Sequence, residues 1–533
     1  MDRAQSKQRH HTRRSFLKLG MAAASVGLAP SLRPARAGVP TTAPQPPGVA
    51  ARPAGPKRGG TLTVAQTDGF VTFNPYERRW YRIRRTMYNS LGHYDRQMNL
   101  QPELAEKWDI SADGKVVTFK LREGVKFHSG REMTSEDVRF SIEFASTNER
   151  VLSRPTYQMV KSVEAPDRYT VVFKLDQPNA GIYDLIDSLH VIDKETVADS
   201  AKMGIGTGPF RLDKYIPNDS IEFVAFKDYW EKGKPYLDRY VTRIIPDAAA
   251  LTINLESGAL DCAFRIPYRD AVRLKASGGK FAVDMGQQGD AMFDVGVNTK
   301  LEPFTNKKVR QAIAWSIDRE RFCRTVLQGL SEPTCLIWPP RSWAYFKDLQ
   351  SKIGYDLGKA KALLREAGLE KGFETEILTA SKRAFGYGEL AMILQYDLKK
   401  IGINTKVADA EVAQYDARTQ KGDIAILVHN YSRANLDPAS TLMAAKAWFP
   451  EKNGGWTHFE NAEYERLRSE LQTTLEREKR IPIARKIQEL VLEECFTMPV
   501  AGQPSVWGCA AHVKGLWYDL DNAPYIGDMW LDK

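Results

Sequence analysis

The segment 70–85 (FVTFNPYERRWYRIRR) carries side chains suited to recognising a small molecule. Trp80 and Tyr81 stand there among five arginines. Aromatic rings of this kind can stack on the ring of a ligand, and Arg79 or Arg82 could meet a carboxylate. The competing interpretation is a solvated helix face, which we favour for at least three of the arginines. These are Arg78, Arg79, Arg82, Arg84 and Arg85.

A second candidate segment is 423–441 (DIAILVHNYSRANLDPAST). Its Arg433 offers a planar fork of N–H donors that matches a carboxylate or a phosphate. The alternative for Arg433 is a surface salt bridge. Asp437 directly precedes Pro438, and we interpret it as a turn residue.

Catalytic and metal-binding patterns are missing from the sequence. There are eight histidines, and His429 and His458 have no H-x-x-H partner. No H-E-x-x-H, no G-x-S-x-G and no Rossmann-type glycine run stands where a strand and a helix would require it. We therefore expect no catalytic residue, no metal site and no cofactor, and a protein that is not an enzyme. A nickel- or haem-type ligand held through His429 or His458 stays open as an alternative.

The N-terminus has the features of an export signal. Arg13 and Arg14 open a segment that resembles the twin-arginine export signal, and the mild apolar run 19–29 follows. Ala35-Arg36-Ala37 is typical of a cleavage site. The run is shorter than the roughly 20 apolar residues that span a bilayer. We expect cleavage near Ala37 and a periplasmic mature chain without stable membrane insertion. A chance arginine pair in a basic terminus is the alternative.

This segment also accounts for most of the positive charge. The formal net charge is +10, but residues 1–37 hold eight Lys or Arg against one acid, which leaves +3 for the rest. We therefore expect no nucleic-acid partner. Residues 38–57 are rich in Pro, Ala and Thr, and we interpret them as a flexible leader.

The five cysteines form no C-x-x-C pair. Two interpretations stay open: a single disulfide between Cys495 and Cys509, or cysteines that are all buried free thiols.

The pattern of strands and helices is mixed throughout. Asp113-Gly114 predicts a hairpin turn, and Gly206-Thr207-Gly208 before Pro209 predicts a tight chain reversal rather than a phosphate cradle. Strands are expected at 61–66, 116–121, 169–175, 221–226, 241–246, 404–408 and 423–429. Helices are expected from Thr134 and at 248–256, 307–318, 356–367 and 389–401. Asp318 should cap a further helix that continues through Cys323. Near the C-terminus, one helix should carry the apolar stripe Tyr464, Leu467, Leu471 and Leu475, and a second should start at Pro482.

Several blocks in series resemble the extracytoplasmic solute-binding proteins of ABC transporters, in the peptide/nickel/opine-binding group (family 5). The strongest block is 101–138, QPELAEKWDISADGKVVTFKLREGVKFHSGREMTSEDV. The others are GTGPF at 206–210 with DYW at 228–230 and KPYLD at 234–238, ESGALD at 256–261, the run from Asn298 to Glu320, and 360–368.

The resemblance implies an α/β, two-lobed periplasmic-binding-protein fold, class II-like, with an additional third domain and the ligand cleft between the lobes. The first lobe would comprise 58–98, 205–290 and 500–533, the additional domain 99–204, and the second lobe 291–499. It also implies a monomer that encloses a small-molecule ligand and delivers it to ABC transporter permease subunits. Export would use the twin-arginine machinery.

Peptide binders of this family commonly carry a Trp and, three residues later, an Asp that pairs with the peptide amine. Aligning on Asp437-Pro438 puts Tyr431 and Ala434 at those positions, so the amine anchor is missing. This favours a carboxylated, opine-like, sugar or modified-peptide ligand over an ordinary dipeptide or oligopeptide, which stays the alternative. An exported metal- or cofactor-binding enzyme and a receptor that serves a sensor are further alternatives. The expected ligand contacts are Phe70, Trp80, Tyr81, Tyr431, Arg433 and Asn435.

Overall fold

The computed structural model describes residues 55–67, 69–70, 72–76, 81–151, 154–284, 291–432, 436–444, 446–450, 454–519 and 523–533. Residues 55–533 form one compact unit. The predicted export signal and most of the predicted leader lie outside the described residues.

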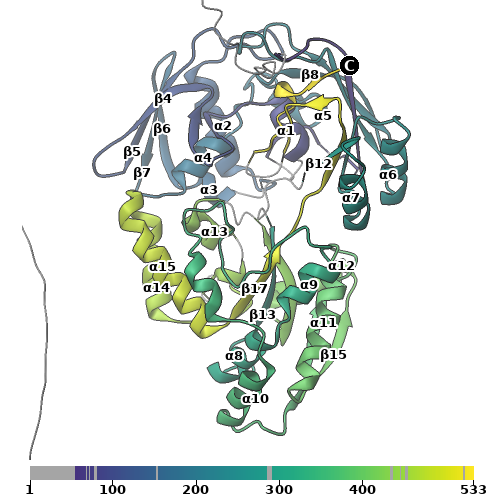
Figure 1. Ribbon diagram of the computed structural model, residues 1–533. Helices are drawn as coiled ribbons and strands as arrows, with labels where there is room; N and C mark the ends of the chain where they lie inside the picture. Colours follow the sequence, from purple (N-terminus) through teal and green to yellow (C-terminus); the bar gives the residue numbers. More distant parts are fainter. Residues whose placement is uncertain are drawn as a thin grey trace, which may run out of the picture. The chain divides into compact units, whose positions relative to one another are not determined.

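A seven-stranded sheet, which we call the first lobe together with its helices, collects strands from distant parts of the chain (Figure 1). Its order is β12 (Phe281–Asp284), β18 (Trp507–Ala510), β11 (Cys262–Phe264), β1 (Thr61–Gln66), β10 (Arg239–Ile244), β9 (Ser220–Ala225) and β8 (Phe210–Ile216). β1 runs parallel to both of its neighbours, and β18 returns antiparallel between β11 and β12. The helices of this part are α1 (Tyr81–Met87), α5 (Ser200–Met203), α6 (Ala248–Glu256) and α7 (Tyr268–Lys275).

A five-stranded sheet defines the second lobe. Its order is β15 (Ile403–Asp409), β14 (Phe373–Thr379), β16 (Ile426–Ser432), β13 (Ala291–Val297) and β17 (Thr497–Gly502). Its helices are α8 (Lys307–Ser316), α9 (Arg319–Thr325), α10 (Leu357–Glu366), α11 (Tyr387–Lys400), α12 (Val412–Lys421), α13 (Pro438–Ala444), α14 (Ala462–Thr473) and α15 (Arg477–Glu494). In Figure 1, α8 and α10 lie side by side beyond the strands, and α14 and α15 form another pair.

A four-stranded antiparallel sheet forms the additional domain. Its order is β4 (Ala105–Ile110), β5 (Val116–Leu121), β7 (Thr170–Leu175) and β6 (Val160–Asp167). The helices are α2 (Ser135–Thr147), α3 (Arg154–Tyr157) and α4 (Ile182–Ser188), and a small ribbon of β2 (Gly92–Tyr94) and β3 (Leu100–Pro102) leads into the domain. One apolar core runs through this domain and most of the first sheet, and another fills the second lobe and reaches α6 and α7.

Local sequence signals placed many elements correctly. The strands at 61–66 and 116–121 and the helix at 248–256 have the predicted bounds. Thr134 forms a reciprocal capping box with Asp137, and Asp318 accepts a hydrogen bond from the N–H of Arg321, as an N-cap does. Asp113-Gly114 makes the turn between the paired strands β4 and β5.

Four predicted boundaries are wrong. The helix expected at 307–318 ends at Ser316, because Ile317 has an extended backbone before the helix that Asp318 caps. The strand expected at 423–429 instead occupies Ile426–Ser432, and Leu475 lies beyond the end of α14. Pro482 lies inside α15 and does not start it: Arg480, ahead of the proline, donates to the Leu471 carbonyl and to Asp437, which holds the first turn in place.

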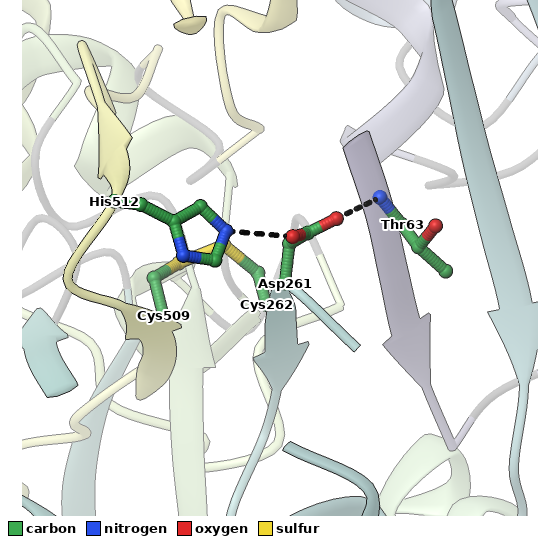
Figure 2. Close-up of a disulfide and its surroundings, with 5 residues drawn as sticks. All are labelled: Thr63, Asp261, Cys262, Cys509 and His512. Carbon is green, nitrogen blue, oxygen red and sulfur yellow. Dashed lines mark hydrogen bonds and ion pairs between the residues drawn. A yellow bond between two sulfur atoms is a disulfide. The ribbon is translucent and has the colours of Figure 1, made fainter. Parts of the chain in front are cut away.

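The structure pairs Cys509 with Cys262 and not with Cys495 (Figure 2). The two cysteines stand opposite each other in the register of β11 and β18, and both are buried. Cys495 instead ends α15 in the second lobe, where its thiol donates to the Leu492 carbonyl at 3.1 Å. The Cys495–Cys509 bridge, one of the two accounts that the sequence left open, is therefore not formed, because Cys495 lies in the second lobe and Cys509 on β18 of the first sheet. Cys323, Cys335 and Cys495 are free and buried.

The motif Gly206-Thr207-Gly208 brings two backbones into contact. The N–H of Gly208 donates to the Met87 carbonyl at 2.9 Å. A Cβ added at Gly208 would stand 2.4 Å from the Met87 carbonyl carbon, and one added at Gly206 would stand 2.2 Å from the Met87 oxygen. These glycines are therefore required by close packing against the end of α1.

The Gly208→Ala variant is expected to lose about 1–3 kcal/mol of unfolding free energy, because the backbone it would strike cannot move aside like a side chain. Urea unfolding of the mature chain measures this loss. Gly354→Ala is the control, since its new Cβ would meet only Trp315 at an ordinary 3.6 Å. Equal losses in both variants would contradict the packing argument.

Candidate ligand-binding site

The chain crosses from the second lobe to the first between β17 and β18, through residues 503–506. The N–H of Gln503 donates to the Ala291 carbonyl at 2.7 Å, and its side chain accepts from the Asn430 amide at 2.7 Å. The Tyr268 hydroxyl donates to the Pro504 carbonyl at 3.2 Å. Both lobes therefore hold this crossing, as expected of a hinge.

The two lobes also touch away from this crossing. The ring of Tyr268 in α7 meets the ring of Phe385 edge-on, with centroids 4.8 Å apart. Phe385 is nevertheless 54% exposed, which is high for an aromatic side chain. The Arg341 guanidinium donates to the Arg96 carbonyl. These contacts join the two lobes away from the crossing, and a ligand cleft between the lobes stays a prediction.

Phe70, a predicted ligand contact, lies in an aromatic cluster of the first lobe. Its ring centroid is 4.3 Å from that of Phe73 and 5.4 Å from that of Tyr215, and it is 6% exposed. The Tyr215 hydroxyl donates to the Phe70 carbonyl at 3.2 Å. Packing accounts for this ring, and its contact with a ligand stays a prediction.

Tyr431 lies in the interior of the second lobe. Its side chain is 2% exposed, and its hydroxyl donates to the Ile337 carbonyl at 2.5 Å. The ring meets Trp448 edge-on at 5.1 Å. These contacts explain the tyrosine without a ligand, so its role at the cleft also stays a prediction.

The other predicted contacts cannot be placed. Trp80, Arg433 and Asn435 lie outside the described residues, as does Ala434. Tyr81 begins α1, and only its backbone is described. Of the arginines interpreted as a solvated face, Arg84 and Arg85 are buried, with 8% and 2% exposure.

Arg85 stands at the centre of a buried ion cluster that sequence reasoning missed. Its guanidinium lies 2.8 Å from Glu103, 2.8 Å from Asp187 and 3.4 Å from Asp519. Burial raises the pKa of Glu103 and of Asp187, and the charge of Arg85 opposes that shift. For Arg85 itself burial acts to lower the pKa, but the facing acidic groups, Asp187 foremost, outweigh it and raise it. No local pattern marks this cluster, since its members are far apart in the sequence.

A cavity of about 520 Å³ opens beside this cluster, lined by the first lobe and the additional domain. The Pro102-Glu103 pair, Trp230 and Lys234 all line it, so several of the sequence blocks meet there. Many of its charged groups pair with one another: Lys234 lies 2.6 Å from Glu231 and 2.5 Å from Asp528. No second-lobe residue lines this cavity, so it is distinct from the candidate cleft.

His429, the alternative metal ligand, lies on β16 with its Nε2 2.9 Å from Asp294 and its ring edge-on to Trp456. Within the described ranges, no group of three or more His, Cys, Asp or Glu residues could hold a metal ion. In that same part of the chain, no helix has the length and apolarity to cross a membrane.

Two sheet-based lobes joined at the crossing 503–506, with a further domain on one of them, are the architecture of periplasmic binding proteins. Residues 99–452 match the family model "Bacterial extracellular solute-binding proteins, family 5 Middle". This chain belongs to that family.

Curated relatives cover most of the chain. Heme-binding protein A of Haemophilus influenzae is 30% identical over 466 residues, which are 80% of this chain and 84% of that protein. The dipeptide-binding protein of Escherichia coli is 29% identical over 456 residues, 78% of this chain and 84% of that protein.

Solved structures share the architecture. The PBP AgaA of A. tumefacien R10, in complex with agropinic acid, has a TM-score of 0.74 at 25% identity and covers 89% of this chain and 99% of its own. The periplasmic binding protein DppA of Helicobacter pylori, in complex with the peptide STSA, has a TM-score of 0.73 at 26% identity, covering 90% and 99%. The predicted α/β two-lobed fold with an additional domain is confirmed.

Proposed function

We propose that this protein is a periplasmic receptor that captures a small solute between its lobes and presents it to the permease subunits of an ABC transporter. Membership of family 5 carries this proposal, and the hinge-like crossing at 503–506 supports it. Closure around a solute would create the form that a permease recognises, and the solute acts by binding the closed form more tightly. The proposal includes a monomer, with the lobe boundaries expected from the sequence and the second lobe extended to the end of β17.

The proposed ligand carries a carboxylate, as an opine-like conjugate or a modified peptide does; a sugar is the uncharged option. The observation behind this choice is the sequence at 431–434, where Arg433 stands beside Ala434 and no acid is available for a peptide amine. The relatives' ligands differ widely, from haem to peptides to agropinic acid, so the fold alone does not select one. An ordinary dipeptide or oligopeptide is the second candidate, favoured by the dipeptide-binding relative.

Export to the periplasm is part of the proposal. The pattern at residues 12–37 supports a twin-arginine signal cleaved near Ala37. The disulfide between Cys262 and Cys509 also supports an oxidising compartment, where such bonds persist.

A thermal-shift panel on the mature chain tests the ligand class at one fixed pH. The panel contains dipeptides, agropinic acid, oligosaccharides, haem and a nickel–histidine chelate. A solute that binds only the folded protein stabilises it by about 2.7 kcal/mol at 100 times its Kd, and the melting temperature rises with concentration. We expect such a rise with agropinic acid or a related carboxylate.

Arg433→Gln should abolish the shift given by the carboxylated solute. Arg466→Gln is the matched control, because this arginine is 55% exposed and pairs with Glu463 and Glu470 on α14. If dipeptides alone raise the melting temperature, the carboxylate proposal is wrong and the peptide alternative replaces it.

A further inference from the structure

The additional domain contacts the second lobe at a pair of aspartates, and also through the Ala180 N–H, which donates to the Gln472 carbonyl at 2.8 Å. Asp184 belongs to α4, and Asp437 directly precedes α13. The N–H of Asp437 donates to both carboxylate oxygens of Asp184, at 3.3 and 3.2 Å. Asp184 is only 4% exposed, and Ser440 on α13 also bonds to it. The beginning of α13 is thus fastened to the additional domain by one carboxylate.

The charges at this contact do not balance. Arg480 on α15 pairs with the Asp437 carboxylate, donating through Nη1 at 2.7 Å and through Nη2 as well. The two side chains are 3% and 6% exposed. Asp184 has no arginine or lysine partner among the described residues. The guanidinium therefore serves Asp437 alone, and Asp184 is a buried carboxylate without a cation whose negative charge a proton would remove.

Everything else that faces Asp184 is neutral or negative. The Tyr94 hydroxyl from β2 lies 3.3 Å from it, and Asp187 on its own helix adds a further negative charge. Tyr94 and Leu436 pack together with Met98, Leu100 and Tyr183 over the contact. Burial first, and then the charge of Asp437, raise the pKa of Asp184 from 3.8 to about 7.

We propose that Asp184 and Asp437 form a latch between the additional domain and the second lobe, and that the latch takes up one proton when the lobes close. This inference rests on the proposed function, since it requires lobes that open and close. In the open form, Asp184 would return to water and regain the ordinary acidity of an aspartate. In the closed form, a neutral Asp184 still accepts the N–H of Asp437 and no longer adds a negative charge beside it.

The direction of the pH dependence follows from this difference. A group that holds its proton more tightly in the closed form stabilises that form. The stabilisation is fully present at pH values below the open-state pKa of the group, near 4. The advantage is lost as the pH rises through the closed-state value of about 7. Between these limits the ratio of closed to open molecules should fall by up to about tenfold per pH unit, as one proton requires.

Small-angle X-ray scattering of the unliganded mature protein from about pH 5 to about pH 9 tests the latch. The radius of gyration of the wild type should increase as the pH rises toward about 7 and then level off. Asp184→Asn keeps an acceptor for the Asp437 N–H and cannot ionise, so this variant should stay compact throughout. Asp176→Asn, an exposed carboxylate of the same domain paired with Lys161, should behave as the wild type does.

A wild-type radius that does not change with pH, or an Asp184→Asn variant that changes like the wild type, would overturn the latch. If Asp184→Asn fails to fold, Asp437→Asn replaces it: it removes a charge that raises the pKa of Asp184, so the increase in radius should begin at a lower pH than in the wild type. The thermal-shift panel is independent of this measurement. A panel without any binding solute would count against the receptor, whereas a flat scattering profile counts against the latch alone.

Discussion

The Arg85→Met variant is expected to lose about 3–5 kcal/mol of unfolding free energy, because it removes the cation from a fully buried cluster and leaves three carboxylates without it. The guanidinium is 1% exposed, and its partners Glu103, Asp187 and Asp519 are between 5% and 7% exposed. Methionine fills much of the same volume, so the missing charge and not a cavity dominates the loss. Urea unfolding followed by tryptophan fluorescence measures the effect.

The loss should also depend on pH. Without Arg85, burial raises the folded-state pKa of Glu103 and of Asp187 further. Carboxyl groups with a raised folded-state pKa destabilise the folded variant near neutral pH. This destabilisation decreases as the pH falls and they take up protons, and it is absent below about pH 4. The deficit of Arg85→Met should therefore be largest near neutral pH and smaller at about pH 5. Arg466→Met is the control, because its ion pairs are exposed to solvent and contribute little to stability. A deficit of Arg85→Met as small as that of the control would show that the cluster does not hold the first lobe to the additional domain.

Replacing both Cys262 and Cys509 by alanine should cost about 2–5 kcal/mol of unfolding free energy. The disulfide joins residues 247 positions apart, so reducing it frees a very long loop in the unfolded chain. It also fastens β18, which comes from the end of the chain, to β11 at the middle of the first sheet. Around it, Asp261 accepts the N–H of Thr63 at 2.8 Å and contacts His512 Nε2 at 2.7 Å (Figure 2).

Thiol counting checks the pairing before any stability is measured. The denatured, unreduced mature chain should react at three thiols and at five after reduction. Cys323→Ala is the stability control, since it removes one buried sulfur without opening a loop and should cost about 1 kcal/mol. Five reactive thiols without reduction would contradict the disulfide, and with it the support that the bond gives to an oxidising compartment.

The local elements were predictable because each depends on a few neighbouring residues. Alternation predicted β5, the glycine pair at 59–60 marked the start of β1, and Thr134 followed by two acidic residues marked the start of α2. The family was predictable for a related reason: its motifs lie in order along the chain, and residues 99–452 match its model. The start of α15 was harder to predict, because Pro482 lies inside this helix and not at its start. The first turn before Pro482 is held by Arg480, whose partners Leu471 and Asp437 are not its neighbours in the sequence.

The sequence by itself determined the family, the two-lobed fold and the absence of catalytic signatures, because these are carried by short ordered patterns. The tertiary structure alone decided which cysteine Cys509 meets, which carboxylates surround Arg85, and that Asp184 faces Asp437 across two domains. Each of these contacts joins residues that are tens to hundreds of positions apart. The packing of the sheets and helices decides which of these residues meet, and patterns of neighbouring residues do not predict that packing.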